Sequence, residues 1–417
     1  MATMIEQYPL TSASLKAECH NIAKWWINHA VDNTNGGFYG EISERNRPVT
    51  KANKGLILNA RILWFFSEAA ITFDNDEYGK IATRAFNYLL NHFDDKQHGG
   101  VFWEVNAVGQ CSNDKKQVYA QSFAIYGLSA YYLFSRNERA KEKALEYFAL
   151  IEKHAVDKKS GGYLEAFAGD WSEVDDVRLS HKDKNSPKTM NTHIHILEAY
   201  TCLYRATKDA KVASSLKALV GIVCDKILDA NTHHLRVFMT LDWQDVSDAY
   251  SYGHDIESSW LVWDAIASLN DKILQQQYEK TVIKMAEVCL AQSLGESGQV
   301  CDQFTFKDKK THSQSFWWVQ AEALVGFLNA FQLTGNAKFL EACESIWQFT
   351  QEQHIDLENG EWLWSAKSDL VKDINACSYK AGFWKGPYHN GRAMMEASAL
   401  LSKIESYIRG KSNANVM

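Results

Sequence analysis

The sequence predicts an all-α protein, an (α/α)6 barrel of six inner and six outer helices with short hairpins at one mouth. Two observations predict it: a turn signal recurs six times along the chain, and two helical stretches of different character separate its copies. The 417 residues are 46% hydrophobic and 23% charged, which is typical of a globular chain with a sizeable core. Because only four prolines and no linker-like run interrupt the chain, we expect a single domain over residues 1–417.

The repeated feature is a turn followed by residues that alternate between apolar and polar, as in a short strand. Glycine or asparagine supplies the positive φ that a tight hairpin needs. The copies lie roughly 60 to 70 residues apart, and this regularity indicates an internal structural repeat. The six segments are NGGFYGEI (at Gly36), HGGVFWEV (Gly99), SGGYLEAF (Gly161), NTHHLRVF (His233), ESGQVCDQF (Gly298) and NGEWLWSA (Gly360).

Each repeat carries two helical stretches of different character. Residues 55–70 are apolar nearly all round, which is typical of a helix buried on every side. Residues 78–92 place a polar stripe that includes Lys80 and Arg84 opposite apolar residues, the pattern of a helix with one face in water. We therefore expect an inner and an outer helix in each repeat. The twelve expected helices span residues 12–30, 53–73, 76–93, 117–135, 138–154, 190–207, 210–228, 254–270, 272–292, 316–334, 337–354 and 387–406.

The helix at 12–30 stands before the first repeat and decides between two arrangements of the helices. It supplies the outer partner that the last inner helix, 387–406, lacks. A closed ring uses this partner, whereas an open superhelical array needs capping repeats at both ends. The sequence favours the ring, with the open array as the alternative.

Composition and charge exclude several classes of protein. The net charge of −7 is spread along the chain, which argues against a nucleic-acid partner. The first residues lack the basic and then apolar pattern of a secretion signal, and no run of about 18 apolar residues predicts a membrane span. We therefore expect a cytoplasmic protein without a membrane partner, as a monomer or weak homodimer.

The eight cysteines show no C-x-x-C spacing, which argues against a zinc site of thiolates and for reduced, mostly buried thiols. They are Cys19, Cys111, Cys202, Cys224, Cys289, Cys301, Cys343 and Cys377.

Unusual polar residues recur near the starts of the inner helices. One such residue alone is more often a cap or a satisfied core group than a catalyst. Ionisable residues in register, within helices otherwise poor in charge, favour a site, because buried charge without a purpose is costly. Since the inner helices all run the same way relative to their hairpins, these residues should converge at one mouth. They are Arg61, Tyr119 with Gln121, Asn191 with His195, His254 with Glu257, Trp318 with Glu322, and His389 with Arg392.

The tryptophans divide by position. Trp64 and Trp263 lie inside apolar helix runs and are expected in the core. Trp318, Trp384 and Trp260 lie beside the ionisable residues, where an indole ring could stack on a sugar.

Two other chemistries stay open from the residues alone. His193 and His195, with His254 and Glu257, could supply four metal ligands, but residues two apart on a helix point to different sides. Glu257 and Glu322 could serve as the two carboxylates of a glycoside hydrolase. The chain contains no phosphate-binding loop, dinucleotide fingerprint or G-x-S-x-G motif, so nucleotide cofactors and serine hydrolysis are disfavoured.

Five segments resemble the N-acylglucosamine 2-epimerase superfamily, and within it they are most similar to cellobiose 2-epimerases. The resemblance covers nearly the whole chain. It implies an (α/α)6 barrel that works without a metal or an organic cofactor on the reducing end of a mono- or disaccharide. A mannose 2-epimerase or isomerase of the same superfamily is the alternative, and a non-catalytic sugar binder is a weaker one. The segments are NKGLILNARILW (53–64), TMNTHIHILEAY (189–200), SYGHDIESSWLVWDA (251–265), WWVQAEALVGFLNA (317–330) and KGPYHNGRAMME (385–396).

The resemblance also implies roles for single residues. His389 and His195 would be the acid/base pair, and His254 would assist ring opening and proton movement. Glu257 would orient an imidazole, and Arg61 would stabilise negative oxygen on the substrate. The expected substrate-binding residues are Asn191, Tyr119, Trp318, Glu322, Trp384, Trp260, Asp183 and Arg392.

These residue types suit epimerisation at C2 of a sugar. The reaction opens the ring, removes a proton next to the C1 aldehyde and returns a proton to the opposite face. Histidine can accept and donate near neutral pH, because its ordinary pKa is about 6.5. A guanidinium beside the two oxygens of the enediolate stabilises the transition state more than the ground state.

Overall fold

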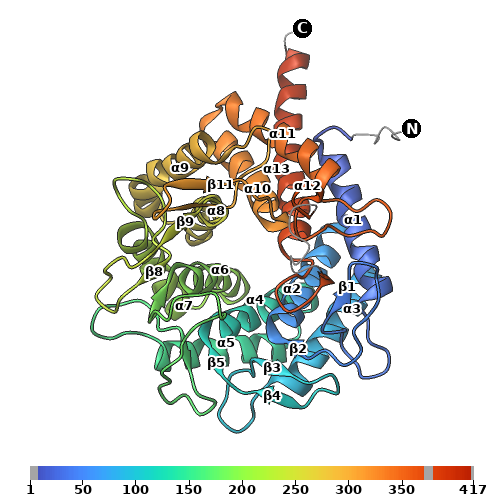
Figure 1. Ribbon diagram of the computed structural model, residues 1–417, viewed down its shortest axis with the longest axis vertical. Helices are drawn as coiled ribbons and strands as arrows, with labels where there is room; N and C mark the ends of the chain where they lie inside the picture. Colours follow the sequence, from blue (N-terminus) through green and yellow to red (C-terminus); the bar gives the residue numbers. More distant parts are fainter. Residues whose placement is uncertain (1–7, 371–378, 415–417) are drawn as a thin grey trace.

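The computed structural model describes residues 8–370 and 379–414, which form a closed ring of helices (Figure 1). The architecture is the predicted (α/α)6 barrel. The inner helices are α2 (Leu56–Phe73), α4 (Val118–Ser135), α6 (Met190–Thr207), α8 (Tyr252–Leu269), α10 (Trp317–Thr334) and α13 (His389–Ala414). The outer helices are α1 (Ser12–His29), α3 (Asp76–Tyr88), α5 (Glu138–His154), α7 (Ala210–Ile222), α9 (Lys272–Ser293) and α11 (Ala337–Gln353).

All twelve expected helices are confirmed, with small differences at their ends. Two outer helices finish in π-helical turns, η1 (Leu89–Phe93) and η2 (Val223–Ile227). The last inner helix starts two residues later than expected and runs on to Ala414, and one short helix, α12 (Lys367–Leu370), was not expected.

Burial follows the two characters seen in the sequence. Fourteen of the eighteen residues of α2 are buried, because inner helices contact neighbours on every side. Outer helix α3 buries one face and begins at Asn75, whose side chain accepts hydrogen bonds from the backbone N–H groups of Glu77 and Tyr78. The arrangement places the starts of the six inner helices at the same end of the barrel.

The six predicted hairpins all form, each held by one antiparallel backbone pairing. Each hairpin follows an outer helix and leads toward the next inner helix, so all six lie at the same end of the barrel. The pairs are Val31 with Phe38, Asp94 with Val101, Val156 with Tyr163, Leu228 with Leu235, Leu294 with Val300, and Ile355 with Trp362.

Short strands link each unit to the next and close the ring. The pairs are β2 (Lys54–Gly55) with β3 (Glu104–Val105), β5 (Lys116–Gln117) with β6 (Ala166–Phe167), β7 (Lys188–Thr189) with β8 (Phe238–Met239), and β9 (Ala249–Ser251) with β10 (Gln303–Thr305). Two further strands, β4 (Cys111–Asn113) and β11 (Lys310–His312), extend these sheets. The last pair joins β12 (Tyr379–Ala381) to β1 (Ile42–Ser43), which excludes the open array.

Buried lysine–aspartate pairs, which the sequence analysis missed, fasten the hairpins to these strands. Lys116 in β5 donates to Asp95 at 2.6 Å, and both side chains are at most 3% exposed. Asp95 also accepts hydrogen bonds from the backbone N–H groups of Gln97 and His98 in its hairpin. Burial alone would raise the pKa of Asp95, but Lys116 and these N–H groups hold it below its ordinary value. The same pairing recurs in Lys54–Asp32, Lys188–Asp157 and Lys380–Asp356.

Among the described helices, α2 is long and apolar enough to cross a membrane by length and composition. It is an inner helix of the barrel, and 78% of that window is buried among its neighbours, as expected of a core helix. The seven described cysteines are free thiols, as expected, and Cys377 lies outside the described residues.

We predict that Lys116→Met lowers the free energy of unfolding by about 3 kcal/mol or more, because it leaves the buried Asp95 carboxylate without its countercharge. Urea unfolding followed by circular dichroism measures the loss. Lys284→Met is the matched control, since Lys284 and its partner Glu287 are about half exposed. Equal stability of the two variants would contradict the proposed role of the buried pair.

Candidate active site

The predicted polar residues lie at two depths below the barrel mouth. Tyr119, Asn191, His254, Trp318 and His389 stand within the first three residues of their inner helices. Four residues further along a helix lies about 6 Å deeper. The deeper set consists of Arg61, His195, Glu257 and Glu322 at the sixth positions, with Arg392 at the fourth position of α13.

Arg61 reaches from α2 to two neighbouring elements. Its guanidinium donates to the backbone carbonyl of Trp384 (2.7 Å) and to the Tyr119 hydroxyl (3.0 Å). The rings of Phe123 and Tyr388 lie within 4.8 Å of its Cζ atom. The guanidinium is therefore held rigidly while its Nε atom has no protein partner.

His195 and Glu198 form a buried pair on one face of α6. The Nδ1 atom of His195 lies 3.0 Å from Glu198 Oε2, and both side chains are 3% exposed. The edge of the Tyr119 ring packs against the imidazole, with ring centroids 5.0 Å apart. His195 thus lies beside the residue that Arg61 contacts.

The other two histidines share one tryptophan. The Trp318 ring lies 4.7 Å from the His254 ring and 5.6 Å from the His389 ring, centroid to centroid. His254 Nδ1 contacts the Ser251 hydroxyl at 2.9 Å, and His389 Nδ1 contacts Glu322 Oε1 at 2.6 Å. As in His195, a protein group occupies Nδ1, which leaves Nε2 as the atom available to a ligand.

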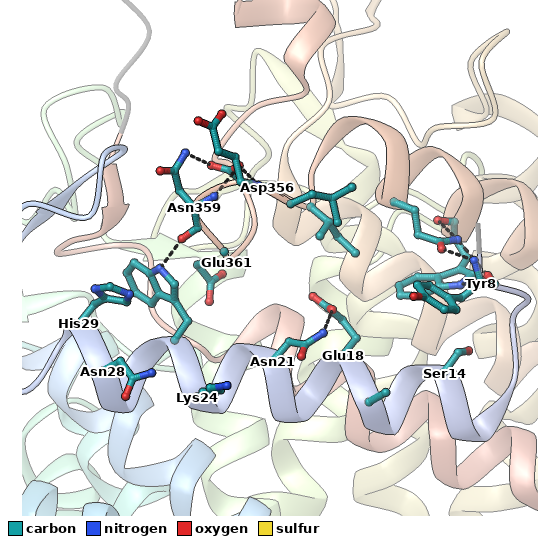
Figure 2. Close-up of a pocket in the computed structure, with 18 residues that line it drawn as sticks. Tyr8, Ser14, Glu18, Asn21, Lys24, Asn28, His29, Asp356, Asn359 and Glu361 are labelled. Atoms are coloured by element: carbon teal, nitrogen blue, oxygen red, sulfur yellow. Dashed lines mark hydrogen bonds between the residues drawn. The ribbon is translucent and has the colours of Figure 1, made fainter. Parts of the chain in front are cut away.

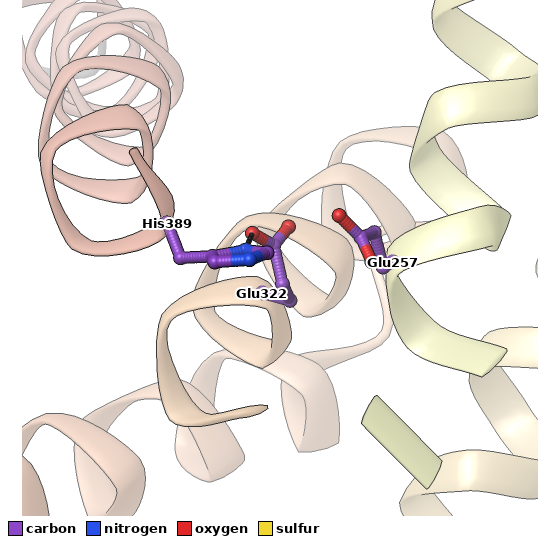
Figure 3. Close-up of side chains that lie close together, drawn as sticks. All are labelled: Glu257, Glu322 and His389. Atoms are coloured by element: carbon purple, nitrogen blue, oxygen red, sulfur yellow. Dashed lines mark hydrogen bonds and ion pairs between the residues drawn. The ribbon is translucent and has the colours of Figure 1, made fainter. Parts of the chain in front are cut away.

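Arg392 lies beneath the histidines and joins three carboxylates. Its Nη2 atom donates to both Glu257 Oε1 and Glu322 Oε1 at 2.7 Å, and its Nη1 atom donates to Glu198. The Trp260 ring covers the guanidinium at 4.7 Å and its indole N–H donates to Glu322. Figure 3 shows Glu322 between His389 and Glu257.

One positive charge cannot neutralise three buried carboxylates, and their pKa values diverge. Burial, together with the charge of Glu322, raises the pKa of Glu257 to about 7. Burial also raises the pKa of Glu322 to about 7, although Arg392 opposes the shift. For Glu198 burial is outweighed by Arg392 and His195, so its pKa lies below the ordinary value. Glu198 therefore carries the charge that balances Arg392.

Burial lowers the pKa of two histidines. For His254 the neighbouring His195 adds to the effect, and for His389 the charges of Arg61 and Arg392 add to it. Both imidazoles are therefore neutral at pH 7, with a lone pair on one ring nitrogen.

Several buried polar atoms at this mouth have no protein partner in the described part of the chain. They include Arg61 Nε, Asn191 Oδ1 and Glu257 Oε2. An unsatisfied buried polar group costs about 1–3 kcal/mol, so a cluster of them indicates a site for a polar ligand.

A hollow of about 340 Å³ adjoins this cluster at the mouth. Its aromatic wall consists of Trp103, Phe383 and Trp384, and Trp384 is the residue whose carbonyl binds Arg61. Its polar wall includes Arg178, Ser180 and His181 from the loop before β7. Aromatic faces beside polar side chains suit a sugar ring.

A larger hollow of about 760 Å³ lies on the outside of the barrel, between α1 and the hairpin after α11 (Figure 2). Trp25, Trp347 and the buried Glu18 line it, and burial raises the pKa of Glu18 to about 7. None of the predicted site residues lines it, so its size does not make it the active site.

Three polar residues near the helix starts bind hairpins and not the site. Gln121 exchanges two hydrogen bonds of 2.9 Å with the backbone of Val101, and Gln320 holds Val300 in the same way. His193 accepts from the Tyr163 N–H through Nε2, while its Nδ1 contacts the Thr189 carbonyl. Both nitrogens of His193 are thus occupied away from His195, which removes it from a shared metal site.

A second candidate metal site consists of Glu257, Glu322 and His389, whose potential ligand atoms lie within 4.8 Å of one another. The guanidinium of Arg392 already bridges the two carboxylates. A cation there would compete with a buried arginine, so these residues fit a metal ion poorly.

The predicted residues are brought together to different degrees. Contacts link all the residues predicted to catalyse the reaction or bind substrate, except Asn191 and Asp183, into one continuous network that passes through Glu198. Asp183 accepts a hydrogen bond from the Ser180 N–H in the loop that lines the mouth, and its substrate role stays a prediction. Arg392, expected to bind substrate, is 1% exposed and binds protein carboxylates, and its substrate role stays a prediction.

Sequence reasoning missed three participants: Glu198, Tyr388 and Ser251. The Tyr388 hydroxyl donates to Glu198 Oε2 at 2.6 Å. Glu198 stands three residues after His195 on the same helix, so the shared helix face was a signal that could have found it.

The chain is similar to characterised sugar-converting proteins over nearly its whole length. A profile of the N-acylglucosamine 2-epimerase (GlcNAc 2-epimerase) family matches residues 37–389. A cellobiose 2-epimerase from Bacteroides fragilis is 42% identical over 375 residues, which span 90% of this chain and 95% of that protein. The chain therefore belongs to the N-acylglucosamine 2-epimerase family and is an isomerase of the epimerase class.

Two further comparisons bear on fold and specificity. The solved structure of cellobiose 2-epimerase from Bacillus thermoamylovorans B4167 matches with a TM-score of 0.87 and 34% identity, over 93% of this chain and 98% of that one. A D-mannose isomerase from Marinomonas mediterranea is 22% identical over 417 residues, or 93% of this chain and 97% of that protein. The resemblance inferred from the five sequence segments is thus confirmed.

Proposed function

We propose that this protein is a sugar 2-epimerase that interconverts C2 epimers at the reducing-end aldose of a disaccharide of the cellobiose type. The observation that carries the proposal is the set of three imidazoles from different inner helices, each held at Nδ1 and each left with Nε2 for a ligand. The identity of 42% to a cellobiose 2-epimerase supports the same conclusion.

The proposed reaction moves one proton off C2 and returns one to the other face. After ring opening, a base removes the C2 proton, and the electron pair passes into an enediolate over C1, C2 and their oxygens. A protonated group on the opposite face then donates a proton to C2. No electron acceptor is needed, because the aldehyde is regenerated at the end.

His195 and His389 are the proposed acid/base pair. They come from the third and the sixth inner helix, on opposite sides of the ring (Figure 1). Each faces a carboxylate at Nδ1, Glu198 for His195 and Glu322 for His389, and a carboxylate there stabilises the imidazolium that forms after proton transfer. His254 has the Ser251 hydroxyl instead of a carboxylate at Nδ1, which suits the proposed assisting role in ring opening.

Arg61 is proposed to stabilise the enediolate oxygens, with Glu257 orienting the neighbouring groups. The guanidinium of Arg61 is fixed by the hydrogen bonds that its two terminal nitrogens donate, so its charge is in place before the reaction starts. Asn191, Tyr119, Trp318 and Trp384 would bind the sugar.

A disaccharide is favoured over a monosaccharide by the hollow at the mouth. Trp384 lies at the border between Arg61 and the hollow, so a second ring could extend over Trp103 and Trp384 while C2 stays beside the histidines. The alternative is a mannose 2-epimerase or isomerase acting on monosaccharides, which the similarity to a D-mannose isomerase supports.

A metal ion is not part of the proposed mechanism, because Arg392 already binds Glu257 and Glu322, the two carboxylates that could hold a cation. A nucleotide is not part of it either, since the chain contains no phosphate-binding loop or dinucleotide fingerprint. Glycoside hydrolysis by Glu257 and Glu322 is disfavoured because both carboxylates are bound to the same arginine. Cytoplasmic location, a monomer or weak homodimer, and a single domain over residues 1–417 remain predictions.

We predict that incubation of cellobiose with the protein in D2O produces its C2 epimer with deuterium at C2, as observed by NMR. Glucose and mannose in parallel samples show whether monosaccharides are preferred. EDTA in a further sample should leave the rate unchanged. Cleavage of cellobiose would indicate a glycosidase, and an unchanged spectrum with all sugars would contradict enzymatic epimerisation.

The same experiment on variants tests the two bases. His195→Asn and His389→Asn should both abolish inversion, but each should retain deuterium exchange with one epimer only, and not the same one. His254→Asn is the comparison. Because the proposal assigns His254 to ring opening and not to one face of C2, this variant should not lose deuterium exchange from one epimer alone. Equal exchange from both epimers in both variants would favour a single base with a mobile intermediate.

We predict that Arg61→Lys lowers kcat by roughly tenfold to a thousandfold, because lysine keeps the charge but loses the planar fork that can hold two adjacent oxygens. Steady-state kinetics on the preferred sugar measures the change. Arg139→Lys, at an exposed position of α5, is the matched control and should leave kcat unaltered. Near-normal kcat in a folded Arg61→Lys variant would remove Arg61 from the mechanism.

A further inference from the structure

Glu198 is a buried carboxylate directly behind one of the site histidines. It lies three residues after His195 on α6, so the two side chains share a helix face. Its oxygens receive hydrogen bonds from Tyr388 and Arg392, and Oε2 also contacts His195 Nδ1. With an exposure of 3% it is almost entirely shielded from bulk water, and its charge depends on these partners.

The donors around Glu198 determine where each proton lies. Arginine can only donate, and its Nη1 atom donates to both Glu198 and the Tyr388 oxygen, the latter at 2.5 Å. Since the Tyr388 oxygen accepts that bond, its own proton is directed to Glu198 Oε2, at 2.6 Å. A carboxylate surrounded by donors is ionised and can only accept.

The tautomer of His195 follows from this arrangement. An ionised Glu198 accepts a hydrogen bond from His195, so the proton of the neutral imidazole lies on Nδ1, and Nε2 carries the lone pair. Burial alone would raise the pKa of Glu198, but Arg392 and His195 hold it below its ordinary value.

The other two histidines lack such a constraint. The Ser251 hydroxyl beside His254 can donate or accept, and either tautomer satisfies it. Glu322, beside His389, has its pKa raised to about 7 by burial, so it can be protonated or ionised near neutral pH. His195 is therefore the histidine whose proton position is fixed by its surroundings.

We propose that Glu198 is a positioning residue that holds His195 with its proton on Nδ1, which keeps Nε2 permanently ready to accept a proton from the sugar. The inference rests on the proposed epimerisation for its effect on rate, whereas the tautomer itself follows from the contacts of Glu198. For the epimer whose C2 proton faces it, His195 acts as the base, and the proton it gains is stabilised by the carboxylate behind it.

Glutamine at position 198 should reverse the tautomer. Arg392 donates to Oε1, and the Tyr388 hydroxyl lies within hydrogen-bond distance of both Oε1 and Oε2. In the glutamine variant these two donors would hold the amide oxygen at the Oε1 position, which leaves the NH2 group at the Oε2 position, facing His195. An amide donor at that place requires the lone pair on Nδ1, so the proton moves to Nε2 and the base is lost. The shape of the side chain is unchanged, which separates this effect from a packing defect.

The experiment combines NMR and kinetics on the full chain. Protein labelled with 15N at histidine, with the His195 signals assigned by their absence in His195→Asn, should show the Nδ1–H tautomer in the wild type and Nε2–H in Glu198→Gln. We expect kcat of Glu198→Gln to fall on the order of 10²- to 10⁴-fold, with KM changed by less than about threefold. Glu198→Asp, which keeps an anionic acceptor, should restore part of kcat and the wild-type tautomer.

The matched control is Glu68→Gln. Glu68 lies on α2 and lines, with Glu198 and Arg392, a hollow of about 130 Å³ below the site, and burial raises its pKa to about 7. Because Glu68 is not among the groups that contact a site histidine, its variant should keep both kcat and the His195 tautomer.

Two results would overturn the proposal: a wild-type His195 with its proton on Nε2, or a reversed tautomer in Glu198→Gln with kcat close to the wild-type value. The wild-type spectrum alone decides the first, even if Glu198→Gln does not fold. A wild-type protein with the Nδ1–H tautomer but no epimerisation would instead contradict the proposed function and leave the positioning by Glu198 supported.

Discussion

Three buried carboxylates meet one guanidinium at the floor of the barrel mouth, and the charge of Arg392 determines which of them is ionised. Glu198 receives its charge-assisted hydrogen bonds from Arg392, while Glu257 and Glu322 share the other nitrogen and have their pKa values raised to about 7. Moving a carboxylate out of water costs several kcal/mol unless a countercharge accompanies it. The protonation states of the three carboxylates therefore depend on the side chain of Arg392.

The two proposed bases, His195 and His389, face carboxylates that differ in protonation state. His195 faces a carboxylate that stays ionised, and His389 faces one that can hold a proton near neutral pH. A site that must take a proton from one face of C2 and return one to the other gains from this asymmetry, because one imidazole is ready to accept while the other pair stores a proton. The ring of β-pairs, closed by β1 and β12, keeps the six helix starts at the distances on which these contacts depend.

The fold was predictable because each level of the sequence agreed on it. Hairpin signals, apolar inner stretches and amphipathic outer stretches all repeat with the same period, and the helix at 12–30 indicated closure. The buried pair of Lys116 and Asp95 was not predictable, because a lysine before a helix usually lies in water.

For the site, register along the inner helices found Arg61, His254 and Glu322. Periodicity alone did not separate Gln121 and His193, which bind hairpins, from residues of the mouth. Glu198 escaped because, at the ninth position of α6, it lies nearly one turn deeper than the predicted residues at the sixth positions.

A 13C NMR titration of the glutamate carboxyl carbons tests the central claim that Arg392 keeps Glu198 ionised at the expense of its neighbours. Signals assigned by single Glu→Gln variants would be followed from pH 5 to pH 9, a range of about two units on either side of neutrality. The account predicts that Glu198 shows no transition in this range, whereas Glu257 and Glu322 take up protons near pH 7. A Glu198 that titrates near neutral pH, or three carboxylates that all stay ionised down to pH 5, would contradict it.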